Sequence, residues 1–437
     1  MILSGILSQS DGGEVWSMSK LAIKGGAPVR NGSWGKWPIV GDEETRLIKE
    51  VTESGVWSYN GPMETEFKRK WAEFTGTRHA IAAANGTVTL QMAWEALGIG
   101  CGDEVIVPGL TWQATAASVI DVNAVPVLVD VEPDTLCINP AAMEAAVTSR
   151  TRAVAAVHMY GTICNMDEIL RIAGKHGLYV VEDCAHQHGS VYKGKKVGAM
   201  GDIGSFSLQQ SKVLTSGEGG LLTTGSSRLA EKLEALRNCG RRPVISEAFG
   251  TDTGNYVSEG YFIQSGNYRI TEFQAAILLA QLERLPAQIA LRDENAQYFN
   301  SRLSTLDGVK PMRREPGTEV QSYFNLAFRY NKNAFKGLPA KKFREALSTE
   351  MDFPFTACYS PLNACELYAP LTKRRHHLSE EYVKAIDPER FRLPVCTKAF
   401  EDEAVCAHHK ILLETGKDMD LIIEAIIKIR ENVDEIL

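Results

Sequence analysis

The chain has 437 residues, of which 44% are hydrophobic and 23% are charged, and its formal net charge is −7. These values are ordinary for a globular protein, and the length suggests two domains or more. Because the charges are spread along the chain without a basic block, binding to nucleic acid is not expected. No apolar run reaches the length that spans a membrane, and the first 17 residues lack the features of a signal peptide.

The nine cysteines are odd in number and form no C-x-x-C pair. This usage predicts reduced thiols in a cytoplasmic protein, with neither a disulfide framework nor a zinc site. Two adjacent histidine pairs, at 376–377 and 408–409, do not have the spacing of metal ligands, and the first pair is expected at the surface. No metal site is therefore predicted.

Residues 1–40 are interpreted as an N-terminal extension and arm. The first 17 residues are expected to have no role in the fold, and residues 19–40 are rich in Gly, Pro and Trp, which is typical of an extended arm. Helices are predicted at about 42–54 and 62–75, where apolar residues recur close to helical spacing.

From residue 79 the pattern changes to short apolar strands alternating with helices. The predicted strands are 79–84, 104–108, 126–131, 153–161 and 179–185, and the predicted helices are 85–98, 115–124, 140–149 and 166–177. Strands that are apolar throughout and alternate with helices predict a mostly parallel sheet with helices on both faces.

The next part of the chain has two further short strands, at 203–208 and 221–224, followed by a helix at 226–238. A loop-rich region is expected at 238–268. The long helical stretch at 270–303 is predicted to be two helices broken near Pro286.

Residues 41–287 are therefore predicted to form a large α/β domain, and residues 288–437 a smaller C-terminal α+β domain. In the smaller domain, the predicted strands are 324–330 and 390–395, and the predicted helices are 341–350 and 418–436.

Lys212 belongs to the stretch 201–220, in which it lies in a polar, glycine-flanked loop between the strands at 203–208 and 221–224. Loops of this kind present reactive groups. An amine held there can form a Schiff base with an aldehyde if a useful fraction stays unprotonated. The alternative is a solvated surface lysine.

Ligands of open parallel sheets bind beyond the carboxyl ends of the strands, and three further features are expected at that edge. The Asn85-Gly86-Thr87 turn opens a helix, so its N–H groups can hold a phosphate or simply cap the helix. Trp112 follows the second strand, where it can stack on a planar cofactor or pack in the core.

Asp183 ends a strongly apolar strand, where a desolvated carboxylate needs a cationic partner or hydrogen-bond donors. A protonated pyridine nitrogen would serve, although a capping aspartate is also common. Together with Lys212, Trp112 and the turn at 85–87, this residue points to pyridoxal 5′-phosphate (PLP), which needs a lysine, an acid, a phosphate seat and a stacking group.

At this point the chain resembles the DegT/DnrJ/EryC1/StrS sugar aminotransferases, which have the aspartate-aminotransferase fold (PLP-dependent transferase fold type I). The resemblance runs from about residue 37 to the C-terminus. It rests on the ordered motifs N-G-T, P-x-x-T-W-x-A-T-A, H-M-Y-G, E-D-C-A-H, G-S-F-S-x-x-x-x-K, G-E-G-G and G-N-Y-R-I-T-E-F-Q-A-A.

The resemblance implies a role for each matching residue. Lys212 would carry PLP, Asp183 would pair with the ring nitrogen, and Lys212 would later move a proton between the substrate and the cofactor. The remaining cofactor contacts implied are Gly86, Thr87 and Ser207 on the phosphate, Trp112 and Ala185 on the two ring faces, His186 near the ring hydroxyl, and Asn267.

Asn267 resembles the residue that reaches the phosphate from a neighbouring subunit, which implies a homodimer with a shared active site. A subset of the family that dehydrates sugars has His in place of the lysine, so Lys212 favours transamination.

The strings around Lys212 and the T-W-Q-A-T-A string, together with C-G-R-R, Y-S-P-L-N and H-H-K-I-L-L, look most like the branch that acts on keto-cyclitols. The expected reaction moves an amino group from L-glutamine or L-glutamate to a scyllo-inosose-type ketone in aminocyclitol biosynthesis. Two alternatives remain: the same chemistry on a nucleotide-linked keto sugar, and a cofactor-binding regulator without turnover.

Overall fold

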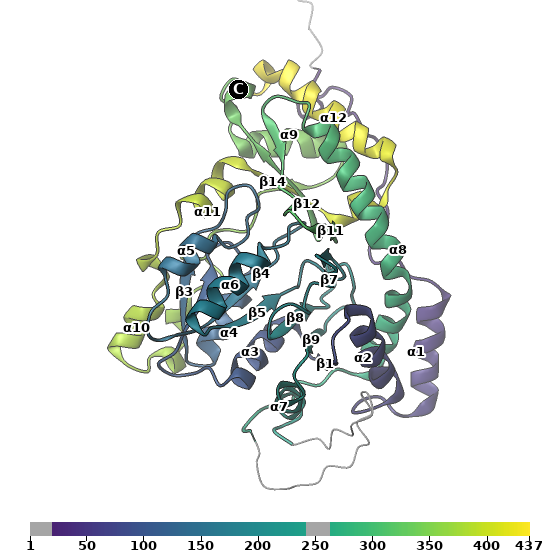
Figure 1. Cartoon of the computed structure of the whole chain (residues 1–437). Coiled ribbons are helices and arrows are strands. Elements are labelled where there is room, and N and C mark those ends of the chain that lie inside the picture. The colour runs from purple at the N-terminus through teal and green to yellow at the C-terminus, as the bar shows by residue number, and fades with distance from the viewer. Residues whose placement is uncertain (1–19, 242–262) are drawn as a thin grey trace, which may run out of the picture.

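The computed structural model describes residues 20–241 and 263–437, and its central element is a seven-stranded sheet (Figure 1). The expected extension at 1–17 and most of the loop-rich region at 238–268 lie outside the described residues. Within the described ranges, no helix is both long and apolar enough to cross a membrane.

The central sheet has the strand order β1-β9-β8-β5-β4-β2-β3. Its neighbouring strands are parallel except for β9, which runs antiparallel to both β1 and β8. The strands are β1 (His79–Ala83), β2 (Glu104–Pro108), β3 (Val125–Val129), β4 (Thr151–Val157), β5 (Tyr179–Asp183), β8 (Ile203–Ser207) and β9 (Gly220–Thr224). The predicted mostly parallel sheet is confirmed.

Helices cover this sheet, and every residue of β2 is buried, which requires cover on both faces. Helix α3 packs against α4 and α7, while α6 packs against α5 (Figure 1). The helices of this part are α1 (Asp42–Ser54), α2 (Pro62–Thr75), α3 (Gly86–Leu97), α4 (Ala114–Asp121), α5 (Pro140–Ala145), α6 (Met166–His176) and α7 (Ser227–Arg237).

Helix α8 (Glu272–Leu303) is continuous, so the predicted break near Pro286 is wrong. A proline inside a helix removes one hydrogen bond and costs about 3 kcal/mol. Leu285 and Ile289, on either side of the proline, are buried in the core of the large sheet, and Phe299 is buried in a second core. Each such side chain contributes about 1.5–3 kcal/mol when fully buried, so packing outweighs the cost of the proline.

The second core lies around a smaller antiparallel sheet of order β10-β12-β14-β13. Helices α9 (Ala340–Met351) and α12 (Gly416–Glu431) pack beside it (Figure 1). Its strands are β10 (Val309–Pro311), β12 (Asn325–Tyr330), β13 (Phe355–Thr356) and β14 (Ala404–His408). A third sheet joins β11 (Thr318–Val320), β6 (Val191–Tyr192) and β7 (Lys195–Lys196).

The strand predicted at 390–395 is wrong, because α11 (Pro394–Lys398) begins inside it. Pro394 occupies the first helical turn, where its missing N–H is not needed. The Asp130 carboxylate accepts hydrogen bonds from the N–H groups of Val395 and Cys396 at 2.8 and 2.9 Å. This carboxylate satisfies the helix start and fixes the segment against the large sheet.

Much of the segment from 358 to 399 therefore packs on the core of the large sheet. Helix α10 (Glu380–Ile386) lies beside β3, and the Tyr382 hydroxyl donates to the carbonyl of Ala124 at 3.0 Å. His376 is buried in this segment, so the expected surface position is wrong for His376, whereas His377 is exposed. Near the start of the segment, Tyr359 enters the site described below.

The N-terminal arm runs over the second core and reaches the lysine loop. The N–H of Ala22 donates to Glu350 at 2.8 Å, and the Trp34 indole donates to the carbonyl of Met351 at 2.9 Å. Further along, the Trp37 indole donates to the carbonyl of Gln210 at 3.2 Å. The arm thus links the smaller sheet to the loop that carries Lys212.

Candidate active site

A cavity of about 380 Å³ opens at the carboxyl ends of the parallel strands. All predicted site residues line this cavity except Asn267. They are Gly86, Thr87, Trp112, Asp183, Ala185, His186, Ser207 and Lys212.

The start of α3 forms one end of the cavity, opposite Ser207. Asn85 caps the helix by accepting a hydrogen bond from the N–H of Val88 at 2.9 Å. The N–H groups at a helix start have no partner within the helix, and they favour an anion. A Cβ on Gly86 would lie 2.7 Å from the Cβ of Ser207, so only glycine allows this approach. The result is a small anion seat between the helix start and a serine.

Asp183 ends β5 with a buried carboxylate. It accepts hydrogen bonds from the Thr115 hydroxyl at 2.9 Å and from the N–H of Ala185 at 3.2 Å. Burial raises the pKa of Asp183 above its ordinary value, and these hydrogen bonds offset the effect only in part. A cationic N–H partner in the cavity would favour the ionised carboxylate.

Lys212 is also buried, although a lysine is normally exposed. Burial lowers the pKa of Lys212 to about 8, while the Asp183 carboxylate acts in the opposite direction. The Nζ atom lies 4.0 Å from the ring centroid of Phe324. A substantial fraction of the amine is therefore neutral near physiological pH, as a nucleophilic lysine requires.

Trp112 is 46% exposed, which rules out the alternative of a core tryptophan. Its ring lies 5.6 Å from that of Tyr359 at an angle of 56°. Together with Ala185, which also lines the cavity, Trp112 leaves room for a planar ligand.

His186 lies between two aromatic rings. Its ring stacks on Phe324 at 4.1 Å and on Tyr160 at 5.6 Å. Burial lowers the pKa of His186 well below its usual range, so the imidazole is neutral. Its Nδ1 accepts the N–H of Tyr160 at 3.2 Å, which puts the proton on Nε2, 3.4 Å from the Tyr359 hydroxyl. The Tyr359 oxygen therefore accepts the His186 Nε2–H, and the Tyr359 hydroxyl can donate its own hydrogen to a ligand in the cavity.

Among the lining residues that sequence reasoning missed, three contact the predicted site residues: Thr115, Phe324 and Tyr359. Thr115 lies in the T-W-Q-A-T-A string, but its contact with Asp183 joins residues 68 positions apart. Phe324 and Tyr359 come from beyond α8, and no local pattern marks their approach to the sheet.

Asn267 is exposed and does not line the cavity of its own chain. It forms an isolated bridge with Asn238, and its side chain accepts the N–H of Arg269 at 3.2 Å.

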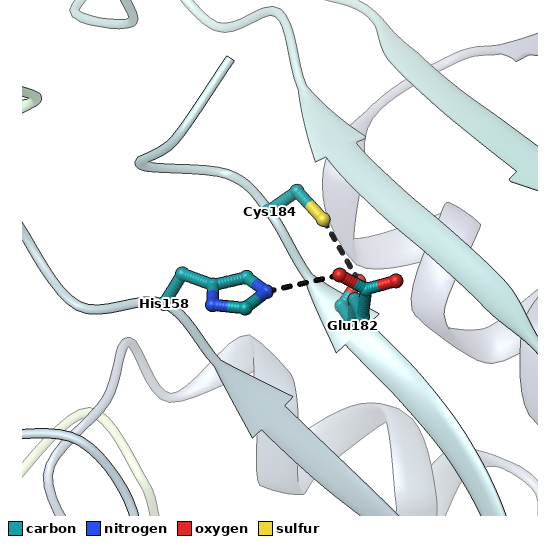
Figure 2. Close-up of side chains that lie close together, drawn as sticks. All are labelled: His158, Glu182 and Cys184. Carbon is teal, nitrogen blue, oxygen red and sulfur yellow. Dashed lines mark hydrogen bonds and ion pairs between the residues drawn. The ribbon is translucent and has the colours of Figure 1, made fainter. Parts of the chain in front are cut away.

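Figure 2 shows a second buried cluster, formed by His158, Glu182 and Cys184. The Nδ1 of His158 accepts the N–H of Cys164, so Nε2 donates to the Glu182 carboxylate at 3.2 Å. Glu182 also accepts N–H groups from Gly198, Met200 and Gly201 at 2.7 to 2.9 Å. Because these hydrogen bonds occupy the lone pairs that a metal needs, the cluster acts as a structural brace between β4, β5 and the turn at 198–201.

The model of the DegT/DnrJ/EryC1/StrS aminotransferase family matches residues 38–407. The chain is 42% identical to the L-glutamine:2-deoxy-scyllo-inosose aminotransferase of Streptoalloteichus tenebrarius, covering 95% of this chain and 99% of that protein. It is 41% identical to the L-glutamine:scyllo-inosose aminotransferase of Streptomyces griseus, covering 96% and 99%.

Two solved structures are similar over nearly the whole fold. The 3-amino-5-hydroxybenzoic acid synthase has a TM-score of 0.78 at 30% identity, covering 93% of this chain and all of that one. An aminotransferase from Psychrobacter cryohalolentis has a TM-score of 0.77 at 29% identity, covering 92% and 100%. The protein is thus a member of the DegT/DnrJ/EryC1/StrS aminotransferase family.

Proposed function

We propose that the protein is a PLP-dependent aminotransferase that transfers the amino group of L-glutamine to a keto-cyclitol of the scyllo-inosose type. One observation carries the chemistry: a buried lysine with a lowered pKa shares a cavity with a buried carboxylate and a helix-start anion seat. The relatives named for 2-deoxy-scyllo-inosose and scyllo-inosose support the substrate class.

The lining residues fit PLP. The N–H groups of Gly86 and Thr87 and the Ser207 hydroxyl suit a phosphate, and a side chain at position 86 would fill that seat. Asp183 suits a protonated ring nitrogen, because its carboxylate is buried without a full set of donors. A cavity of about 380 Å³ is also of the size that holds a small ligand.

When bound, PLP supplies a carbonyl carbon that takes up an amino group and a ring that accepts electrons. The protein supplies the acid–base groups, Asp183 and Lys212. The Asp183 carboxylate holds a proton at the ring nitrogen, and Thr115 fixes the carboxylate in place at 2.9 Å. The Lys212 Nζ takes a proton from the substrate carbon and would deliver it to the cofactor carbon that bears the amino group. A pKa of about 8 suits Lys212 to both steps.

The acceptor side of the cavity offers hydroxyl and aromatic groups. Tyr359 can donate its phenolic hydrogen, since the His186 Nε2–H already occupies its oxygen at 3.4 Å. We propose that this hydrogen contacts a hydroxyl of the cyclitol ring. No extended basic patch lines the cavity, within the described residues, to hold a nucleotide diphosphate.

We propose that the active site is completed in a homodimer, in which Asn267 of one protomer reaches the cofactor phosphate of its partner. The support is its exposed position outside its own cavity and its place just before α8. A phosphate dianion also needs more donors than Gly86, Thr87 and Ser207 offer.

A substrate panel tests the proposal. The PLP-loaded protein is given L-glutamine or L-glutamate with scyllo-inosose, 2-deoxy-scyllo-inosose or a nucleotide-linked keto sugar, and the amine product is measured by mass spectrometry. We expect amination of a keto-cyclitol with glutamine. Amination of the nucleotide-linked sugar alone would overturn the substrate class, and a protein that binds PLP but aminates none of them would overturn the activity.

A further inference from the structure

Arg292 of α8 has a fully buried side chain, 0% exposed, with no acceptor for any of its three guanidinium nitrogens among the described residues. Burial lowers the pKa of Arg292 to about 9, which still leaves the group cationic at neutral pH. Burying a cation without hydrogen-bond acceptors costs free energy, so the Arg292 guanidinium needs an acceptor.

Two buried histidines, His188 and His409, each have an acceptor atom that receives no hydrogen bond from the described residues. The Nε2 of His188 lies 2.9 Å from the carbonyl of Ser207, and the Nε2 of His409 lies 3.0 Å from the carbonyl of Ser211. Because a carbonyl only accepts, each Nε2 must carry the proton, and burial lowers the pKa of both rings so that they are neutral. Each Nδ1 is therefore a lone-pair acceptor, and neither has a donor among the described residues.

The three side chains are neighbours. The Trp37 ring contacts the His409 ring edge-to-face at 4.5 Å, and the Arg292 Cζ lies 5.1 Å from the same Trp37 ring. The Arg292 charge lowers the pKa of both His188 and His409, and His188 lowers the pKa of His409 as well. Donors without acceptors and acceptors without donors thus lie in the same buried region.

Water suits this point better than an anion, because the two Nδ1 lone pairs would repel a negative charge. A buried water typically makes about three hydrogen bonds to polar groups that otherwise lack partners. It can accept from the guanidinium and donate to the imidazoles.

We propose that Arg292, through ordered water, donates to the Nδ1 atoms of His188 and His409 and thereby holds their Nε2–H groups on the carbonyls of Ser207 and Ser211. These carbonyls lie at the two ends of the segment 207–211 that leads to Lys212. Arg292 is then a positioning residue for the lysine, which rests on the function proposed above.

The first test reads the tautomers without any cofactor. In protein labelled with ¹⁵N-histidine and freed of PLP, both imidazoles should show a protonated Nε2 and an unprotonated Nδ1. Arg292→Met removes the donors at similar length, and replacing a buried charge by an apolar group often preserves folding. Because the carbonyls of Ser207 and Ser211 still hold the Nε2 protons, we expect the same tautomers in this variant, but with the ¹⁵N shift of each Nδ1 moved toward that of a nitrogen that accepts no hydrogen bond. Unchanged Nδ1 shifts at both histidines would overturn the proposal.

The second test measures how fast Lys212 reacts with PLP. The rate at which PLP forms a borohydride-reducible link to Lys212 is measured without donor or acceptor substrate. We expect Arg292→Met to slow the link about tenfold, the factor that corresponds to one lost hydrogen bond of about 1.4 kcal/mol. A rate within twofold of the wild type would overturn the positioning role.

A matched pair at His409 keeps the proposal testable if Arg292→Met does not fold. In His409→Gln the amide nitrogen reaches the place of Nε2 and can still donate to Ser211, whereas in His409→Asn it is too short. We expect the glutamine variant to link PLP nearly as fast as the wild type and the asparagine variant about tenfold more slowly. Equal rates in the pair would overturn the proposal.

The failure of the proposed function would look different. If wild-type Lys212 forms no link at all, the function is wrong, while the Nδ1 shifts of the cofactor-free protein still decide whether Arg292 supplies hydrogen bonds to the two histidines.

Discussion

Gly86→Ala tests the anion seat from its geometry. The new Cβ would lie 2.7 Å from the Cβ and 3.1 Å from the Cα of Ser207. Carbon atoms prefer about 3.5–4.0 Å, so the helix start and Ser207 must separate by roughly 1 Å. Overpacking of this kind costs about 1–3 kcal/mol, and here the cost falls on the two groups that would hold the phosphate.

We therefore expect the Kd for PLP, measured by absorbance titration, to rise by about 5- to 150-fold, since each 1.4 kcal/mol is a factor of ten. Gly174→Ala is the matched control. Gly174 lies in α6, and no heavy atom lies within 4 Å of its added Cβ. The control should bind PLP normally and gain about 0.5–1 kcal/mol of stability. If Gly86→Ala binds PLP within twofold of the wild type, the seat is wrongly placed.

Four further predictions concern the protonation of Lys212, the carboxylate of Asp183, substrate contact and assembly. The rate of PLP attachment should rise about tenfold per pH unit up to about pH 8 and then level off, because burial lowers the pKa of Lys212 to about 8 and only the neutral amine attacks. Asp183→Asn should move that plateau to lower pH, because the carboxylate raises the pKa of Lys212. The same variant should reduce turnover at least about hundredfold. An unmoved plateau would count against the pairing of Asp183 with Lys212. Tyr359→Phe should lower kcat/KM for the keto-cyclitol about tenfold through one lost hydrogen bond while leaving PLP attachment unchanged, and an equal loss in both would point to a structural role. Mixing Lys212→Ala chains with Asn267→Ala chains should restore activity, because one site of each mixed dimer carries both changes and the other carries neither; inactive mixed dimers would exclude the shared site.

The sheet and most of the site could be predicted from the sequence, because both depend on local patterns. The short apolar strands before α3 and α4 and around Lys212 are marked by their composition and by the turns that bound them. Asp183 and Ser207 end such strands, so their place at the carboxyl edge followed from the strand assignment.

The errors arose where tertiary packing decides. Pro286 signals a break, yet burial on both sides of it keeps α8 continuous. The segment R-F-R-L-P-V at 390–395 looks like a strand, but the Asp130 carboxylate, far away in sequence, caps a helix there. Phe324 and Tyr359 enter the cavity from beyond α8, and nothing in their neighbouring residues indicates that approach.

Borohydride reduction of the PLP-loaded protein, followed by peptide mapping, tests the central claim most directly. Lys196 is a built-in control, since burial lowers its pKa as well although it lies outside the cavity. We expect one labelled lysine, Lys212, with the label lost in Lys212→Ala and retained in Lys196→Ala. A label on any other lysine, or one that persists in Lys212→Ala, would contradict it.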